Sequence, residues 1–140
     1  MATTNTTERV TLETAQTMIN AARRKAEEIG VPMNIAVVDG GNNLVAFARM
    51  DNAWLGSIGI AHGKAYTARA FDMPTKDLAR KAQPGQPLYG IEATNPGRIV
   101  IFPGGVPLTS AGAVVGAIGA SGGTPDQDQQ VAEAAAAAFS

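Results

Sequence analysis

Apolar residues recur at every third or fourth position in two stretches of the chain, and this spacing predicts amphipathic helices. The first helix begins after Thr11, whose hydroxyl can cap it, and ends at Gly30, which Pro32 follows closely. The second helix is the last element of the chain. Thr124 can cap its start and Gln127 completes a capping box, so local signals alone predict where this helix begins.

Short apolar runs bounded by glycine and asparagine predict β-strands. The clearest pair covers residues 33–38 and 43–49, because the intervening Asp39-Gly40-Gly41-Asn42 suits a hairpin turn. Three further strands are expected toward the C-terminus, at residues 98–102, 106–109 and 113–120. Strands joined by tight turns pair antiparallel, so the sequence predicts a single antiparallel sheet of about five strands.

Two more helices are predicted between these groups of strands, at about residues 53–71 and 75–81. Residues 83–96 are rich in proline and glycine and are expected to form a loop. Helices that are not interleaved between strands lie on the faces of a sheet, so the predicted fold class is α/β in the α+β sense. We interpret residues 1–10 as a flexible N-terminal arm and residues 11–140 as one domain.

Charged residues are scarce in this chain, and their scarcity suggests contacts between subunits. They make up 16% of the 140 residues, whereas about 25% is typical of soluble domains. The net charge of −1 and the lack of a basic stripe argue against a nucleic-acid partner. There is no cysteine and no apolar run of membrane-spanning length, and Met1 to Arg9 lacks the apolar core of a secretory signal. We therefore expect a cytoplasmic homo-oligomer.

Several motifs, taken in their order along the chain, resemble those of one known family. They are NIAVVDGG at 34–41, LVAFARMD at 44–51, KA and TA at 64–65 and 67–68, GGVP at 104–107, VGAIGASG at 115–122, and QD at 127–128. This order resembles the HbpS/GlcG-like family of haem-binding or haem-degrading domains. The resemblance implies a profilin-like sheet flanked by helices and oligomers up to the octamer. It also implies that some members bind haem or a related tetrapyrrole, and that others serve bacterial catabolic pathways.

Five residues are candidates for a ligand site. Arg49 ends the second hairpin strand, and Asp51 follows it in the loop. The Arg49 guanidinium could bind a carboxylate of a ligand. The alternative is a salt bridge from Arg49 to Asp51 or to a helix, which would fix the loop. Lys64 is expected among apolar neighbours, which would lower its pKa and suit a base or an anion holder, unless it is a surface lysine. The HbpS/GlcG-like pattern that the chain resembles also has a lysine at the position of Lys64. Gly104 and Gly105 could form an anion nest or a β-bulge.

His62 is the only histidine and is a candidate axial ligand for haem iron or an acid–base group. No family-wide histidine is carried over to this position by the resemblance. At 100° per residue, His62 and Lys64 lie about 160° apart around the predicted helix, so one pocket cannot easily hold both. The alternative for His62 is a structural or solvated side chain. No motif for a metal site or a catalytic triad is recognised.

These candidates leave three interpretations open. The first is an oligomeric protein that binds haem, another tetrapyrrole or a small anionic metabolite near Arg49, Lys64 and Gly104-Gly105. The second is a small catabolic enzyme that clamps a carboxylate-bearing substrate with Arg49 and uses Lys64 as base. The third is an accessory or scaffold subunit without a ligand. The cofactor stays open, with haem as one candidate.

Overall fold

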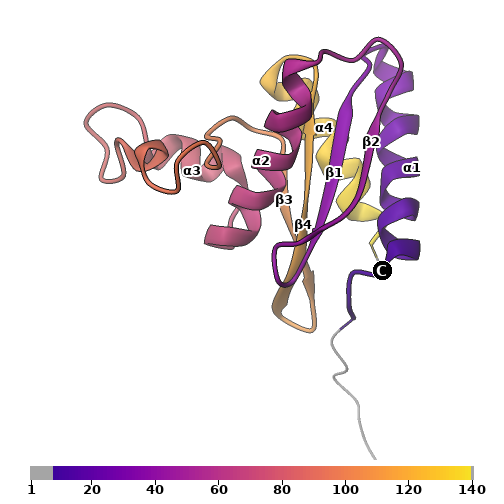
Figure 1. Ribbon diagram of the computed structural model, residues 1–140, viewed down its shortest axis with the longest axis horizontal. Coiled ribbons are helices and arrows are strands. Elements are labelled where there is room, and N and C mark those ends of the chain that lie inside the picture. The colour runs from indigo at the N-terminus through magenta and orange to yellow at the C-terminus, as the bar shows by residue number, and fades with distance from the viewer. Residues whose placement is uncertain (1–7, 140) are drawn as a thin grey trace, which may run out of the picture.

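Four antiparallel strands form one sheet, which confirms the predicted α+β class (Figure 1). The computed structural model describes residues 8–139. The strands run in the spatial order β2-β1-β4-β3, with bounds β1 (Asn34–Asp39), β2 (Leu44–Arg49), β3 (Gly105–Ser110) and β4 (Ala113–Ser121). The two central strands, β1 and β4, pair in register from Asn34↔Ser121 to Asp39↔Gly116.

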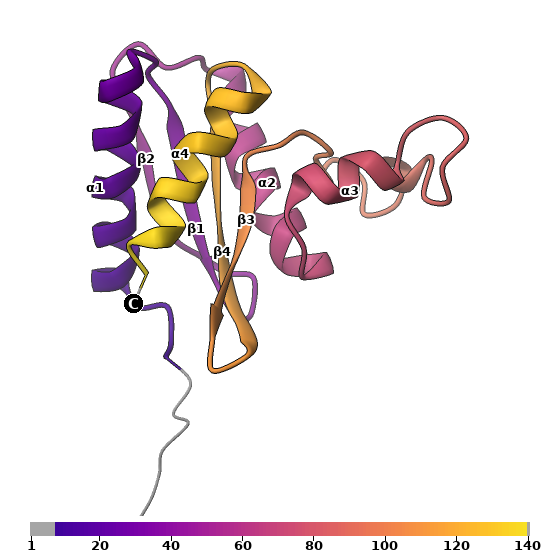
Figure 2. The same ribbon diagram turned by 180° about the vertical axis from the view of Figure 1, so that it is seen from behind.

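Helices cover both faces of the sheet. On one face α1 (Leu12–Ile29) and α4 (Pro125–Ala137) lie side by side (Figure 2), and the larger apolar core fills the space beneath them. On the other face α2 (Gly56–Phe71) packs alone over β1 and β4. Gly119 makes this close packing possible, because a Cβ atom there would lie 2.1 Å from the backbone oxygen of Ala61.

The segment after α2 extends away from the sheet (Figure 1). It contains α3 (Thr75–Lys81) and a short 3-10 turn, η1 (Ile91–Ala93). Its outer part is largely exposed, including Tyr89 at 68%. The prediction of a mostly irregular stretch at residues 83–96 is confirmed.

The strand predicted at residues 98–102 is wrong, and this is why the sheet has four strands rather than five. The backbone of this stretch bonds to side chains of the helices instead of to a neighbouring strand. Thr67 Oγ1 donates to the Arg98 oxygen and accepts from the Val100 nitrogen, and Thr75 Oγ1 donates to the Phe102 oxygen. This apolar run thus lies against α2 and α3 without joining the sheet.

The helix caps and the hairpin agree with the sequence. Thr11 and Thr124 cap α1 and α4, and Gln127 completes the second capping box.

Residues 1–7 of the predicted N-terminal arm lie outside the described residues. Residues 8–10 lie against the domain, where the Glu8 nitrogen donates to Ser110 Oγ over 2.8 Å. No helix in the described part of the chain is long and apolar enough to cross a membrane.

Candidate functional site

The first of three candidate places is a pocket of about 220 Å³ between α2, the end of β4 and the start of α4. We call it the lysine pocket. Both helices begin at this end of the molecule (Figure 1). Its lining residues include Trp54, Ser57, Lys64, Phe102, Ser121 and Asp128. The two aromatic side chains are 66% and 54% exposed, whereas the other four residues are almost completely buried.

Lys64 lies on the floor of the lysine pocket and is 1% exposed. Its Nζ donates to Asp128 Oδ2 over 2.7 Å and to the backbone oxygen of Ala120 over 2.9 Å. Burial lowers the pKa of Lys64, while the hydrogen bond and the charge of Asp128 act in the opposite direction. A buried amine with a carboxylate partner is either a structural ion pair or the polar end of a binding site.

Asp128 anchors the start of α4 as well as Lys64. Its Oδ1 accepts hydrogen bonds from the backbone nitrogens of Gly122 and Gly123, at 3.1 and 2.9 Å. Both carboxylate oxygens are therefore occupied. Sequence reasoning did not select Asp128 as a site residue. Its spacing to the buried Val131 and Ala132 was a usable signal, because positions i, i+3 and i+4 share one helix face.

Gly104 and Gly105 do approach Lys64, although not as an open anion site. A Cβ atom at Gly104 would lie 2.9 Å from Lys64 Nζ, and Gly104 has a φ of 122° that favours glycine. The Gly104 nitrogen already donates to Gln129 Oε1 and the Gly105 nitrogen to Thr75 Oγ1. The pair therefore makes room for the lysine, and β3 begins at Gly105.

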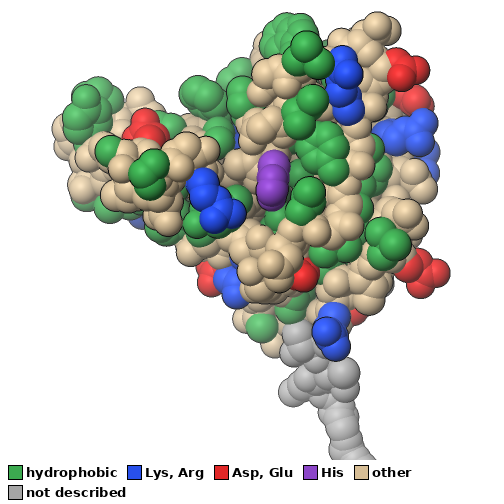
Figure 3. Space-filling view, in the orientation of Figure 1, with side chains coloured by type: hydrophobic (Ala, Val, Ile, Leu, Met, Phe, Trp, Pro, Cys, Tyr) green, Lys and Arg blue, Asp and Glu red, His purple; other side chains and the backbone are tan. Residues whose placement is uncertain are grey.

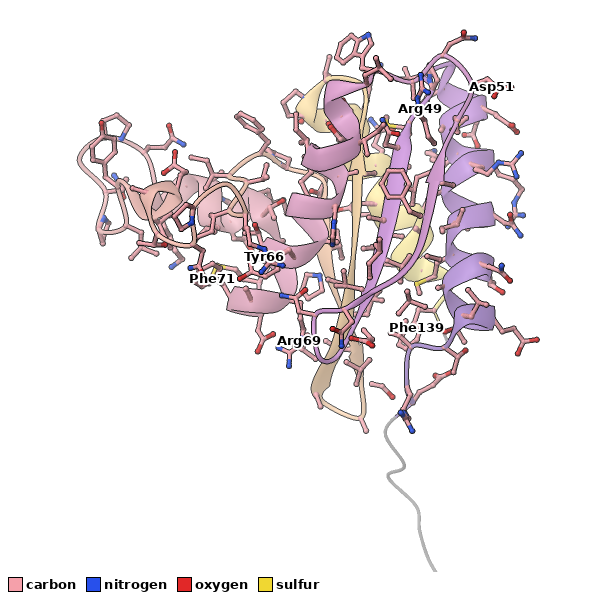
Figure 4. All side chains as sticks on the ribbon, in the orientation of Figure 1. Arg49, Asp51, Tyr66, Arg69, Phe71 and Phe139 are labelled. Carbon is pink, nitrogen blue, oxygen red and sulfur yellow. The ribbon has the colours of Figure 1, made fainter. Side chains whose placement is uncertain are left out.

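Arg49 and Asp51 line a second depression, of about 320 Å³, between β2 and α1 (Figure 4). Arg49 Nε and Nη2 both donate to the backbone oxygen of Ala53, at 3.2 and 3.1 Å. No ion pair joins Arg49 to Asp51 in the described structure. The structure thus places Arg49 in a different depression from Lys64. It fixes the loop before α2, where Asn34 Nδ2 also holds the Trp54 oxygen over 3.0 Å.

His62 lies on the outward face of α2, in a third place of about 230 Å³ that we call the histidine groove. It is the single purple side chain near the centre of Figure 3. The groove is also lined by Gly59, Tyr66 and Arg98, and the Arg98 guanidinium stacks 3.7 Å from the centre of the Tyr66 ring. Burial and, secondarily, the charge of Arg98 lower the pKa of His62. The imidazole is therefore neutral near pH 7, as a metal ligand must be.

The separation of His62 from Lys64 follows from the helix, as their spacing predicted. His62 faces the histidine groove, and Lys64 points into the lysine pocket on the opposite flank. His62 takes part in no hydrogen bond or ion pair with another residue in the range 8–139. No group of three or more metal-ligating side chains occurs among these residues.

The chain matches the family model described as haem degrading protein HbpS-like over residues 10–137. An uncharacterized 15.0 kDa protein of Citrobacter freundii is 46% identical over 131 residues, which cover 94% of this chain and 92% of that protein. Protein GlcG of Escherichia coli is 34% identical over 107 residues, covering 76% and 77%. The corrinoid adenosyltransferase PduO of Citrobacter freundii is 40% identical over 87% of this chain. The chain spans only 36% of that protein.

Two solved structures share the fold over nearly the whole chain. Protein ORFY of Klebsiella pneumoniae superposes with a TM-score of 0.92 at 41% identity, covering 99% of this chain and 96% of that one. The PduOC:heme complex superposes with a TM-score of 0.90 at 34% identity, covering 94% and 95%. A fold similar to this one has thus been crystallised with haem.

Proposed function

Because the chain belongs to the family of HbpS-like haem degrading proteins, we propose that it binds haem or a related tetrapyrrole. The observation that carries this proposal is the similarity to the PduOC:heme complex, at 34% identity and over 94% of this chain. The identity of a relative's ligand is a weaker argument than a site in the chain itself. The chain's own residues must therefore supply an iron ligand and an apolar surface.

The histidine groove meets the first requirement best. His62 is neutral, has no hydrogen-bond partner among the described residues and stands on a helix, which fixes the position of its backbone. Haem iron is commonly held by a histidine nitrogen. When bound, haem would supply the redox and ligand chemistry of its iron, and His62 would orient the macrocycle against α2. Arg98 beside the groove could pair with a haem carboxylate.

Gly59 supports a close approach to this face of α2. A Cβ atom there would meet nothing within 4 Å, so the packing of the chain does not require glycine at this position. Glycine inside a helix costs about 1 kcal/mol relative to alanine. A flat ligand or a second subunit that lies against the helix would explain a bare surface beside His62.

The size of the groove favours a homo-oligomer. Pockets for drug-sized ligands usually measure about 300–1,000 Å³, whereas the histidine groove measures about 230 Å³. A haem held by one chain would therefore remain largely exposed. The low charge and the exposed apolar residues, such as Leu55 at 70%, suit a second copy that covers the other face of the ligand.

The experiment is a haemin titration followed at the Soret band, with wild type, His62→Ala and the control Gln16→Ala on the exposed side of α1. We expect saturable binding to wild type and to the control, and an affinity at least about tenfold lower for His62→Ala. No Soret shift with wild type would refute haem binding and favour the scaffold interpretation. An unchanged titration of His62→Ala would refute only the role of His62.

An enzymatic role is the second candidate. The family description names haem degradation, so the Soret band of bound haem would decay faster than that of free haemin when ascorbate is added in air. The alternative of a carboxylate substrate clamped by Arg49 and deprotonated by Lys64 is less favoured. The two residues line different depressions, and Lys64 already donates to two acceptors.

A further inference from the structure

The lysine pocket has hydrogen-bond donors that the fold does not use. The hydroxyls of Ser57 and Ser121 line the pocket, and each residue is 4% exposed. Neither hydroxyl bonds to another residue between positions 8 and 139. The buried hydroxyls of Thr67 and Thr75, by contrast, are both hydrogen-bonded. Neither oxygen is among the fully buried side-chain atoms that lack a partner in this range, so both hydroxyls reach the open space of the pocket, where a ligand can bond to them.

Lys64 adds a third donor to the same pocket. An ammonium group has three N–H bonds, and the described structure shows acceptors for two of them, Asp128 Oδ2 and the Ala120 oxygen. Both oxygens of Asp128 already serve the fold, since Oδ1 accepts from Gly122 and Gly123 and Oδ2 accepts from Lys64. The Lys64 N–H can only donate, and the two serine hydroxyls can donate as well as accept, so a group rich in acceptors can bond to all three.

The start of α2 gives the pocket a positive end. No side chain caps this helix and its first turn holds no acidic residue, although Ser57 lies in that turn. The starts of α1 and α4 are both capped and both carry acidic residues, so they need no further anion. The Ser57 and Ile58 nitrogens donate to the Trp54 and Leu55 oxygens, and the dipole of α2, with no acidic side chain in its first turn, favours negative charge beside Ser57.

The walls of the pocket are apolar. Trp54 and Phe102 are more than half exposed at its rim, and Ile60 and Pro125 also line it. The loop that carries Trp54 is held by Arg49 on the Ala53 oxygen and by Asn34 on the Trp54 oxygen. A volume of about 220 Å³ is too small for a tetrapyrrole but admits a small molecule with a flat or short apolar body.

From these contacts we infer that the lysine pocket is a second binding site, for a small monocarboxylate whose apolar body lies between Trp54 and Phe102. Its carboxylate accepts hydrogen bonds from Ser57, Ser121 and Lys64. Asp128 is a positioning residue, because it holds the lysine rather than the ligand. This site is separate from the histidine groove, since His62 lies on the other flank of α2.

Trp54 is the only tryptophan, so its fluorescence reports directly on this pocket. The probe is benzoate, a flat monocarboxylate, and the matched control ligand is benzamide, which has the same shape without the charge. We expect a saturable change with benzoate and binding at least about tenfold weaker with benzamide. Equal binding of the two, or no saturable change with benzoate, overturns the carboxylate site.

Three variants test the role of the hydroxyls. Ser57→Ala and Ser121→Ala should each weaken benzoate binding about tenfold, because each removes a hydrogen bond to a charged group. Thr17→Ala on the far side of the sheet should leave it unchanged. A purely structural serine would instead lower the stability of the unliganded protein when replaced. Serine variants that bind benzoate like wild type overturn the proposal.

A carboxylate can also come from a haem propionate, and the haemin titration separates the two sources. Benzoate should not displace haemin, and Ser57→Ala should leave the Soret titration unchanged while it weakens benzoate binding. If benzoate and haemin compete, the pocket holds a haem carboxylate and the separate site is refuted. Failure of haem binding would leave the benzoate result intact, so the two proposals fail independently.

Discussion

The ion pair between Lys64 and Asp128 joins α2 to the start of α4, and Asp128→Asn tests what it contributes. Asparagine keeps the shape and an acceptor oxygen for Gly122 and Gly123, but it leaves the lysine buried without a counter-charge. Removing one partner of a buried pair costs about 3–5 kcal/mol. We therefore expect the free energy of unfolding to fall by that amount at pH 7.

The same substitution gives a pH dependence with a definite sign. An unpaired Lys64 can escape its penalty by losing a proton, which at pH 7 costs at most about 5 kcal/mol relative to its ordinary pKa of 10.5. At pH 9 the cost of removing this proton falls to at most about 2 kcal/mol. The unfolded chain then binds more protons than the folded variant, so the stability of the variant rises with pH relative to wild type. The difference in the free energy of unfolding between wild type and Asp128→Asn should decrease by up to about 1.4 kcal/mol per pH unit.

The assay is urea unfolding followed by Trp54 fluorescence at pH 7 and pH 9, at several protein concentrations so that subunit association is accounted for. Asp126→Asn is the matched control, since this exposed neighbour in the first turn of α4 makes no ion pair with a described residue. It should cost at most about 1 kcal/mol, without dependence on pH in this range. A loss below about 1 kcal/mol for Asp128→Asn at pH 7, or a loss equal at both pH values, would refute the reasoning.

Three further predictions concern single positions. Gly119→Ala should destabilise the protein by about 3 kcal/mol or more in urea unfolding, because the added Cβ would collide with the Ala61 oxygen. Gly59→Ala should stabilise the unliganded protein by about 1 kcal/mol, because a Cβ there meets nothing and alanine favours the helix. Thr124→Ala should cost about 0.5–2 kcal/mol in the same assay through loss of the α4 cap; no loss would contradict the capping box. In an NMR titration of the unliganded protein, the pKa of His62 should lie below 6.5, so acidification below that value lowers stability. A higher pKa would contradict the burial of this ring.

The elements that the sequence predicted correctly are those encoded by neighbouring residues. The caps at Thr11 and Thr124 and the hairpin turn at residues 39–42 need no distant partner. The strand prediction for residues 98–102 was wrong because the same apolar pattern suits a strand and an irregular segment that packs against helices. Its backbone groups are instead hydrogen-bonded by Thr67 of α2 and Thr75 of α3, which lie far from it in the sequence.

The candidate site shows the same division. Lys64 could be selected from its apolar neighbours, but Asp128 lies 64 positions further along the chain, and only the packing of α4 brings the two together. Ser57 and Ser121 look like ordinary small residues in the sequence. Both residues are buried and neither hydroxyl bonds to a described residue, which is a property of the folded chain. Arg49 was selected as a ligand clamp, and the structure shows it holding the loop before α2.

Helix α2 is the element that both proposals share, and its sequence reflects the two demands. One flank carries His62 and the bare Gly59 toward the histidine groove, and the other carries Ser57 and Lys64 toward the lysine pocket. The third side packs against the sheet through alanines at Ala61, Ala65 and Ala68. The two proposed sites leave α2 only this narrow apolar face to bury against the sheet. The small alanine side chains, together with Gly119 on β4, let α2 pack closely on the sheet.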